Sequence, residues 1–477
     1  MKKILSLVLA LCLLCGMICA VAEGEVPTVT WYAVGSGMPA NYEAWQAAVN
    51  AYIEPIIGCH LDYRCIGWGD WGDRRSVIIN SGENFDIMFG AGAGDQARDV
   101  NKGAFQPIDE LLEEYGQGLL ELIPADYFKA TSVNGKIYGV PTYKDSSITE
   151  YFLWDKGLLA EMGLTEDAMA AHTLEEVSPI LYAMKEYMEE KTGTTFNPIN
   201  LAGELPAYKW LYEGVGFGLG AISVRYDDPE AKVVETYRAE DIMAEQQLMR
   251  QWYLDGIINP DAATLASVPA YNACYLAQGW STAAETSWAT GHGDAGCLAV
   301  QFDTITILST ESVLGSVNYI GANSANPDKA MAVLNLVNTD TKFRDMLYFG
   351  LEGDNFDYID GRVHKNNSDW TFAGYTQGTF FNVSLQDTDV VDQWAEVKEL
   401  NASAVPHVLL GFGFDPTNVA DQIDNCSQIF ETYGAELKTG TIDPETAINA
   451  MYDEMYAAGL QEIIDEAQAQ VDAFLGK

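Results

Sequence analysis

The first hundred residues repeat one pattern of apolar and polar positions three times. Residues 26–34 alternate β-branched and aromatic side chains with smaller ones and predict a strand. Residues 41–52 place apolar side chains at helical spacing and predict an amphipathic helix. A strand over 59–66, a helix that ends at residue 79 and a strand over 85–89 follow. Strands that alternate with helices in this way predict a parallel sheet covered by helices.

Each of these three strands ends in a loop rich in glycine. Ligands of such sheets bind outside the carboxyl ends of the strands, so we expect Ser36, Trp71 and Asp95 to face a ligand. A carboxylate at position 95 can accept hydrogen bonds from hydroxyl groups. It can equally cap the helix expected to begin near Gln96, and the sequence leaves both roles open.

The rest of the chain carries further helical and strand patterns without an internal repeat or a linker. The pattern predicts helices over 175–191, 239–254 and 326–337, a strand over 315–322, and a helical tail over 443–476 that breaks at Gly459. Pro327 stands at the first position of its helix, where its missing N–H has no cost.

The first 22 residues have the features of a secretory signal peptide. Lys2 and Lys3 precede an apolar run over 4–14, and Ala20 to Ala22 form a small-residue cleavage site. The apolar run is too short to span a bilayer comfortably. Its cysteines raise the question of a lipid anchor, but Cys15 and Cys19 lack the small residue expected before a lipidated cysteine. We therefore expect an extracellular, cell-surface-associated protein, cleaved after Ala22.

Charge and cysteine content narrow the classes further. The net charge of −43 disfavours nucleic acid and anionic membranes and favours a neutral or cationic ligand. With 48% apolar and 11% aromatic residues, the chain does not resemble a disordered one. The cysteines outside the signal segment are Cys59, Cys65, Cys274, Cys297 and Cys426. Cys274 and Cys297 are a conceivable pair, but the spacings predict buried free thiols rather than a disulfide framework or a zinc site.

No motif of a cofactor site or of catalysis is present. The glycines at 90, 92 and 94 and at 216, 218 and 220 lack the spacing of a dinucleotide loop. The five histidines are scattered, and there is neither an HExxH nor a GxSxG motif. We therefore expect no metal, no cofactor and no catalytic residue.

Residues 134–141 read NGKIYGVP and are followed by Tyr143-Lys-Asp145 and an apolar run over 152–159. This passage resembles the bacterial extracellular solute-binding proteins of family 1, the capture components of sugar and oligosaccharide ABC importers. Blocks over 315–353 and 405–460 extend the resemblance, the last one toward the lipoprotein-type oligosaccharide binders. Together they cover nearly the whole mature chain. The chain departs from the family pattern in its signal segment, where the cysteines lack the small residue expected before a lipidated cysteine.

The resemblance implies an α/β fold of the two-lobed, periplasmic-binding-protein-like type II. Each lobe would be a β-sheet flanked by helices, with a cleft and a hinge between the lobes. After the signal peptide over 1–22, the first lobe would comprise 26–141 and 303–349. The second lobe would comprise 142–302 and 350–477.

The resemblance also implies where the ligand is contacted. Trp210 and Trp280 would offer aromatic faces to a sugar, whose C–H groups match a flat apolar ring. The other contacts it implies are Tyr143 and Lys144 after the crossing, Tyr208 at the second-lobe rim, and Phe414 and Asp415 in the last block. The residues alone leave alternatives open: Lys144 can pair with Asp145, Phe412 and Phe414 can be core, and any tryptophan can pack at a loop base.

By this resemblance the chain captures an oligosaccharide or another small solute by hinge closure and delivers it to ABC-transporter permease subunits. We expect a monomer that is not an enzyme and binds no nucleic acid. The alternatives are a secreted glycosidase, which would need two suitably spaced carboxylates, and a binder of peptides.

Overall fold

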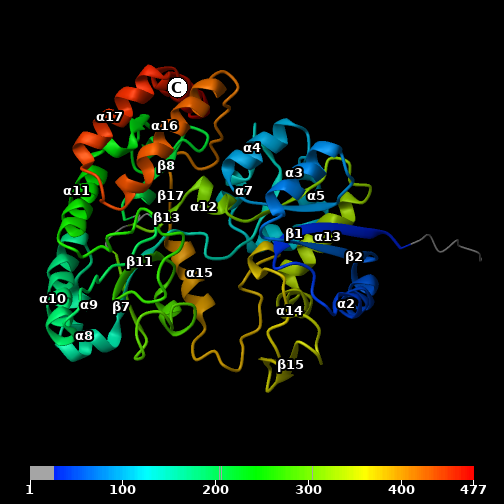
Figure 1. Cartoon of the computed structure of the whole chain (residues 1–477). Coiled ribbons are helices and arrows are strands. Elements are labelled where there is room, and N and C mark those ends of the chain that lie inside the picture. The colour runs from blue at the N-terminus through cyan, green and yellow to red at the C-terminus, as the bar shows by residue number, and fades with distance from the viewer. Residues whose placement is uncertain (1–25, 204, 206, 303–304) are drawn as a thin grey trace, which may run out of the picture.

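The computed structural model describes residues 26–203, 205, 207–302 and 305–477 and shows two lobes side by side (Figure 1). The predicted signal peptide over 1–22, with its cysteines, lies outside the described residues. Both lobes combine sheets with covering helices, which confirms the predicted two-lobed α/β fold.

The first lobe is built on a five-stranded sheet with the order β2-β1-β3-β14-β6. Its strands are β1 (Thr28–Gly35), β2 (His60–Gly67), β3 (Ile87–Gly90), β14 (Val317–Ile320) and β6 (Gly139–Pro141). β1 pairs in parallel with β2 and β3, as the alternating pattern predicted. β14 returns from the second lobe and runs antiparallel to both β3 and β6, so the sheet as a whole is mixed.

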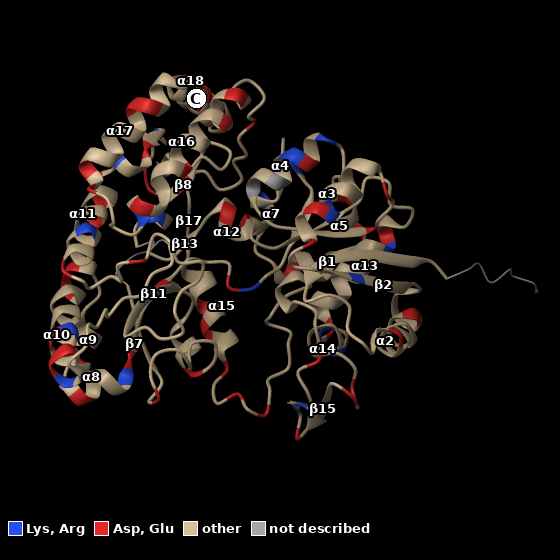
Figure 2. Cartoon of the chain, viewed as in Figure 1, with Lys and Arg blue, Asp and Glu red and all other residues tan. Residues whose placement is uncertain are grey.

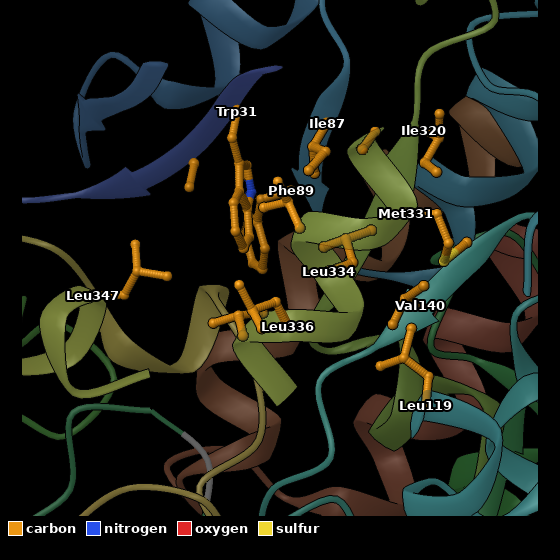
Figure 3. Packing of buried hydrophobic residues seen from close by; sticks show 14 of the residues in the cluster. Trp31, Ile87, Phe89, Leu119, Val140, Ile320, Met331, Leu334, Leu336 and Leu347 are labelled. Carbon is orange, nitrogen blue, oxygen red and sulfur yellow. The ribbon is translucent and has the colours of Figure 1, made fainter. Parts of the chain in front are cut away.

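Helices cover both faces of this sheet and close a large core on one face and a smaller one, around Tyr32, Met88 and Tyr319, on the other. They are α2 (Tyr42–Ile57), α3 (Trp71–Ser81), α4 (Ala93–Asn101), α5 (Asp109–Tyr115), α6 (Gln117–Leu122), α7 (Ala125–Ala130), α13 (Pro327–Thr339) and α14 (Thr341–Phe349). Trp31 on β1 and Phe89 on β3 point toward Leu334 and Met331 of α13 (Figure 3), and all four side chains are buried. Burial of such large apolar groups is the main source of the lobe's stability.

The second lobe holds two three-stranded sheets rather than the single sheet expected from the sequence. One has the order β11-β7-β12 and consists of β11 (Cys274–Gln278), β7 (Glu150–Asp155) and β12 (Cys297–Gln301). The other has the order β10-β9-β8 and consists of β10 (Val234–Glu235), β9 (Ile222–Arg225) and β8 (Tyr212–Gly214). Both sheets are antiparallel. Each packs on its own hydrophobic core, so the second lobe consists of two separately packed parts.

Separate groups of helices cover these two cores. The first core packs against α8 (Lys156–Met162), α9 (Thr165–Ala170) and α10 (Leu174–Thr192), and the second against α16 (Ala420–Lys438), α17 (Pro444–Ala457) and α18 (Leu460–Phe474). α11 (Glu240–Leu254) contributes buried residues to both. The predicted break at Gly459 is confirmed, because this residue adopts a φ of 107° between α17 and α18.

Three segments of the chain cross between the lobes and are hydrogen-bonded to one another. β13 (Ile307–Leu308) pairs in parallel with β17 (Val405–Pro406). On the other side of β13, the Ile148 N–H donates to the Ile307 carbonyl at 2.8 Å. The three crossings therefore lie side by side, with α12 (Thr310–Leu314) directly after β13 and α15 (Gln393–Ser403) before β17. In Figure 1, α12 and α15 lie on the side of the second lobe that faces the first.

The remaining described elements are short. They are β4 (Ser132–Val133), β5 (Lys136–Ile137), β15 (Phe356–Ile359), β16 (Arg362–Lys365) and the 3-10 turns η1 (Lys209–Leu211), η2 (Thr236–Arg238), η3 (Ser281–Glu285) and η4 (Gly374–Thr376). The five cysteines of the described residues are buried free thiols, as predicted, and Cys274 and Cys297 are not bonded.

Packing on the first core continues past residue 349, the boundary expected from the sequence. Phe372 is 6% exposed and its ring centroid lies 5.2 Å from that of Trp45 on α2. Tyr375 packs on the same core. The segment around these two residues thus belongs with the first lobe, although the sequence suggested the second.

A fully buried arginine holds this segment in place. Arg344 on α14 is 0% exposed. Its guanidinium donates hydrogen bonds to the carbonyls of Thr379 at 2.8 Å and Gly374 at 2.9 Å and to Gln377 Oε1 at 2.7 Å. Burial lowers the pKa of Arg344 to about 10, which still leaves the group charged at neutral pH. The positive charge is offset by the carbonyl dipoles of one loop rather than by a carboxylate in direct contact.

We expect Arg344→Ala to lower the free energy of unfolding by about 3 to 5 kcal/mol, because several buried acceptors lose their donor. Urea denaturation followed by circular dichroism measures this. Lys342→Ala, two residues away, removes an exposed ion pair with Glu352 and should cost less than about 1 kcal/mol. Equal losses in the two variants would show that the buried hydrogen bonds are not what stabilises the segment.

Candidate functional site

A cavity of about 370 Å³ lies where the two lobes meet. The first lobe contributes Gly92 and Gly94 at the start of α4, directly after the carboxyl end of β3. The second lobe contributes β8 with the loop after it and residues 412–414, and the start of α12, which follows the crossing β13, completes the lining. In Figure 1, α4 faces the second lobe across this region.

The start of α4 is fixed by buried polar contacts. The Arg75 guanidinium on α3 lies 2.7 Å from the Asp99 carboxylate of α4, and both side chains are buried. The Tyr319 hydroxyl of β14 donates to Gln96 Oε1 at 2.9 Å. The first N–H groups of a helix have no partner within the helix and carry a partial positive charge. α4 therefore presents hydrogen-bond donors at the cavity from a rigid base.

Backbone conformation allows the lobes to come close at this point. Gly92 has a φ of 93°, a region that favours glycine, and it occupies the N-cap position of α4. A Cβ at Gly94 would lie 3.7 Å from the ring of Phe217 in the second lobe. The helix N-terminus and an aromatic ring thus form opposite sides of one narrow space.

Aromatic rings make up much of the second-lobe wall. Trp210, Phe217, Phe412 and Phe414 line the cavity. The Trp210 indole nitrogen is buried and has no hydrogen-bond acceptor within the described part of the chain. A buried N–H without an acceptor costs free energy, so this group is suited to a ligand oxygen.

The polar centre of the wall is Glu213 on β8. Its side chain is 8% exposed, and its Oε1 accepts a hydrogen bond from the Thr310 N–H at 3.0 Å. Its Oε2 lies 3.3 Å from His407 Nδ1. This contact is not an ion pair, because Nδ1 already accepts the Leu409 N–H at 3.0 Å and Nε2 lies 3.1 Å from the Val224 carbonyl.

Burial sets the protonation states of both groups. It raises the pKa of Glu213 to about 8 and lowers the pKa of His407 to about 4. Both side chains are therefore uncharged at neutral pH, since desolvation disfavours the charged form of each.

Two of the residues predicted from the sequence line this cavity, Trp210 and Phe414. Asp95 lies in the first turn of α4, beside the cavity wall, and its side chain is outside the described part of the structure. The helix begins at Ala93 with Gly92 as its N-cap, so the expected capping role of Asp95 near Gln96 is wrong.

The first-lobe residues predicted as contacts lie elsewhere. Ser36 is exposed after β1, with its N–H donating to the Thr371 carbonyl at 2.9 Å. Trp71 is half-buried against Phe89, with ring centroids 6.0 Å apart. Both stand at the carboxyl edge of the sheet without lining the cavity.

The residues that follow the first crossing are structural in their contacts. Tyr143 is 4% exposed in the first core, with its ring against those of Tyr127 and Phe381. Lys144 pairs with Asp145 at 2.9 Å, which is the alternative that the sequence left open. Neither side chain reaches the cavity wall.

Trp280 serves to join two elements of the second lobe. Its indole N–H donates to Gln393 Oε1 at 3.3 Å, and its ring centroid lies 5.7 Å from that of Trp394. Gln393 and Trp394 are both on α15. Tyr208 packs its ring on Phe302, at 5.3 Å. The Asp415 carboxylate accepts from the N–H and hydroxyl of Thr417 in a local turn.

Glu213 and Phe217 line the cavity but were not predicted from the sequence. The signal closest to them is the run of glycines at 216, 218 and 220, which does not fit a dinucleotide loop. In the structure this run wraps the cavity, with Gly218 at a φ of 88°. Within the described ranges there is no cluster of three or more potential metal ligands and no helix able to cross a membrane.

A carbohydrate ABC transporter substrate-binding protein from Streptococcus pneumoniae serotype 4 is 28% identical over 96% of this chain and 92% of its own. The crystal structure of the N-glycan transport solute binding protein (NgtS) of S. pneumoniae superposes with a TM-score of 0.82. It is 26% identical and covers 94% of this chain and 99% of its own. The chain is a solute-binding protein of an ABC transporter.

Two further comparisons concern the fold and the C-terminal region. An HMO-binding, ABC-transporter-associated solute binding protein of Bifidobacterium longum infantis superposes with a TM-score of 0.60 at 14% identity, over 95% of this chain and 99% of its own, and shows the fold alone. A family model described as a domain of unknown function, DUF3502, matches residues 408–476. In this solute-binding protein that region includes the cavity residues Phe412 and Phe414 and the helices α16 to α18.

The buried His407 should make this solute-binding protein acid-sensitive. Because its folded pKa of about 4 lies below the unfolded value near 6.5, the unfolded chain binds the extra proton between these limits. The histidine's stabilising contribution is therefore complete above pH 6.5 and is lost as pH falls toward 4, by about 3 kcal/mol.

Urea denaturation between pH 7.5 and 4.5 checks this expectation. His407→Asn should remove most of the acid-side loss, whereas the exposed His172→Asn should retain it. If both variants follow the wild type, His407 does not carry the acid sensitivity.

Proposed function

We propose that the solute is an oligosaccharide, that one end of it binds in the interlobe cavity, and that hinge closure presents it to a membrane permease. The observation that carries the proposal is the cavity wall itself, with Trp210, Phe412 and Phe414 beside the donors of α4. The likeness to NgtS, which has also been solved in complex with Man5GlcNAc, gives the class of glycan to try first.

Aromatic and polar groups recognise different parts of a sugar in such a site. Ring faces match the C–H faces of a pyranose, and N–H groups donate to its hydroxyls. A volume of about 370 Å³ is near the lower end for small-molecule sites, so the cavity suits a terminal sugar unit. At the same carboxyl edge of the first-lobe sheet, after β2, Trp68 is 54% exposed and stacks on Tyr375 with centroids 6.2 Å apart. This exposed ring is a platform for a further unit.

Cellular setting and partners belong to the same proposal. The protein would be exported, cleaved after Ala22 and active as a monomer at the cell surface. Acidic side chains are spread over the helices of both lobes and outnumber basic ones (Figure 2), which suits a neutral glycan and a permease rather than nucleic acid. The predicted lobe boundaries, moved so that residues 370–381 join the first lobe, would define the two moving bodies.

Hydrolysis is the alternative that a specific observation favours. The cavity is lined by two carboxyl groups, Glu213 and Glu311, and glycosidases use such pairs. The relatives named above are substrate-binding proteins, so we infer capture without turnover. Incubation of the protein with excess Man5GlcNAc, followed by chromatography of the glycan, should return it intact.

Isothermal titration of the mature protein with Man5GlcNAc should give 1:1 binding with a Kd in the micromolar range, about −8 kcal/mol. Trp210→Ala should weaken binding at least tenfold, because one ring face and one N–H donor are lost, with little change in Tm. Tyr115→Ala removes an exposed ring on α5 that is not part of the cavity lining, and this matched control should bind normally.

Binding of peptides and of no glycan in a panel would overturn the substrate class while leaving the fold intact. A large loss of Tm in Trp210→Ala with unchanged affinity would assign Trp210 to the core instead.

A further inference from the structure

We propose that Glu213 is held as an uncharged carboxylic acid where the cavity meets the hinge, donates one hydrogen bond to a solute oxygen, and permits capture only while it keeps its proton. The inference rests on the proposed function, since it assigns a role to a group in that same cavity. It adds a proton requirement and a named donor to the binding site.

The position of the carboxyl group makes a charge there unfavourable. Glu213 is 8% exposed, and no lysine or arginine forms an ion pair with it within the described residues. Its Oε2 lies beside His407, whose Nδ1 is occupied as an acceptor by the Leu409 N–H. The Nδ1 lone pair disfavours a negative charge on Oε2 3.3 Å away, and because the Leu409 N–H already occupies that lone pair, Nδ1 accepts no hydrogen bond from a protonated Oε2.

The proton on this carboxyl group also lacks a partner. Oε1 accepts from the Thr310 N–H, whereas Oε2 is buried without a hydrogen-bond partner within the described part of the chain. Such a group costs free energy in an empty site. Because Glu213 lines the cavity, a hydroxyl or ring oxygen of the solute can supply the acceptor.

Glu213 is also linked to two of the three crossings. Thr310, its hydrogen-bond donor, begins α12 directly after β13. The Thr310 hydroxyl donates to the Leu409 carbonyl at 3.2 Å and accepts the Gly411 N–H at 3.0 Å, both on the segment that follows β17. The same side chain thus contacts the cavity and the backbone on which the lobes would turn.

The charged groups around Glu213 do not favour its ionisation. Glu311 on α12 lines the same cavity and repels a second negative charge. On β9 the residue opposite is the apolar Val224. Lys209 on η1 is the cation of the lining, and His407 lies on the segment after β17. Desolvation is the largest influence and raises the pKa of Glu213 to about 8, so the acid form dominates at neutral pH.

Capture should therefore depend on pH in one direction. When solute fills the cavity and the lobes close, water leaves, and an ionised Glu213 would be a buried and unpaired charge. Affinity for Man5GlcNAc should be constant from pH 6 to about 7.5 and fall about tenfold for each pH unit above 8. Binding near pH 8.5 should be accompanied by uptake of a fraction of one proton, measured by titration in buffers of different ionisation enthalpy.

Three variants separate the roles. Glu213→Gln keeps a donor without a titrating proton, so its affinity should stay within threefold of wild type at pH 7 and remain flat to pH 9.5. Glu213→Leu removes the donor and should bind at least tenfold more weakly at pH 7. Glu240→Gln, an exposed carboxylate on α11 outside the cavity, makes the same charge change and should keep the wild-type pH profile.

A measurement without ligand tests the uncharged carboxyl group by itself. The folded pKa lies above the unfolded value near 4.3, so the wild type loses stability as pH rises from about 4.5 to 8 and Glu213→Gln does not. The Tm difference between the two should widen across this range and then stay constant. A constant difference throughout would overturn the inference whether or not any glycan binds.

The outcomes for the two proposals are distinct. Glycan binding that is independent of pH, or that strengthens above pH 8, would overturn this inference and leave the proposed function standing. Failure of Man5GlcNAc and of a wider glycan panel to bind at any pH would overturn the proposed function and, with it, the ligand contact assigned to Glu213.

Discussion

The arrangement of this protein depends on the hydrogen bonding of three crossing segments between the lobes. Ile148, β13 and β17 come from distant parts of the chain, yet their backbones pair in one small sheet. Backbone pairing fixes the three segments together while leaving only a few residues to absorb a change of angle. Lobes joined at one side by such crossings open and close about them. The geometry of a site beside the crossings changes with that movement.

A few buried polar groups hold loops and helices at defined positions in the two lobes. Arg344 organises the loop that packs on the first core, Arg75 and Asp99 anchor α4, and Glu213 and His407 share the second-lobe side of the cavity. Each group costs free energy to bury, and hydrogen bonds with strict geometry offset that cost, except at Glu213 Oε2, which has no hydrogen-bond partner within the described residues. The cores give stability, and these contacts set the positions of the cavity walls.

The predictable and the unpredictable parts of the structure differ in the range of the contacts involved. Local periodicity predicted the first three strands and their helices, and the proline at its first position predicted the start of the helix at Pro327. Neither signal predicted the division of the second lobe into two sheets or the return of residues 370–381 to the first lobe. In one of these sheets β7 pairs with strands more than a hundred residues away, and residues 370–381 are held by packing on Trp45 and by hydrogen bonds from Arg344. No local pattern indicates such distant contacts.

The sequence by itself determined the two-lobed α/β fold, the class of protein and two aromatic residues of the cavity, Trp210 and Phe414. The tertiary structure alone decided that Tyr143 and Trp280 would serve in packing and that Glu213 would face the cavity uncharged. The physical reason is that periodicity and motifs report what a residue does with its neighbours in the chain. The environment of a side chain, and hence its protonation and its free hydrogen bonds, depends on segments that only folding brings to it.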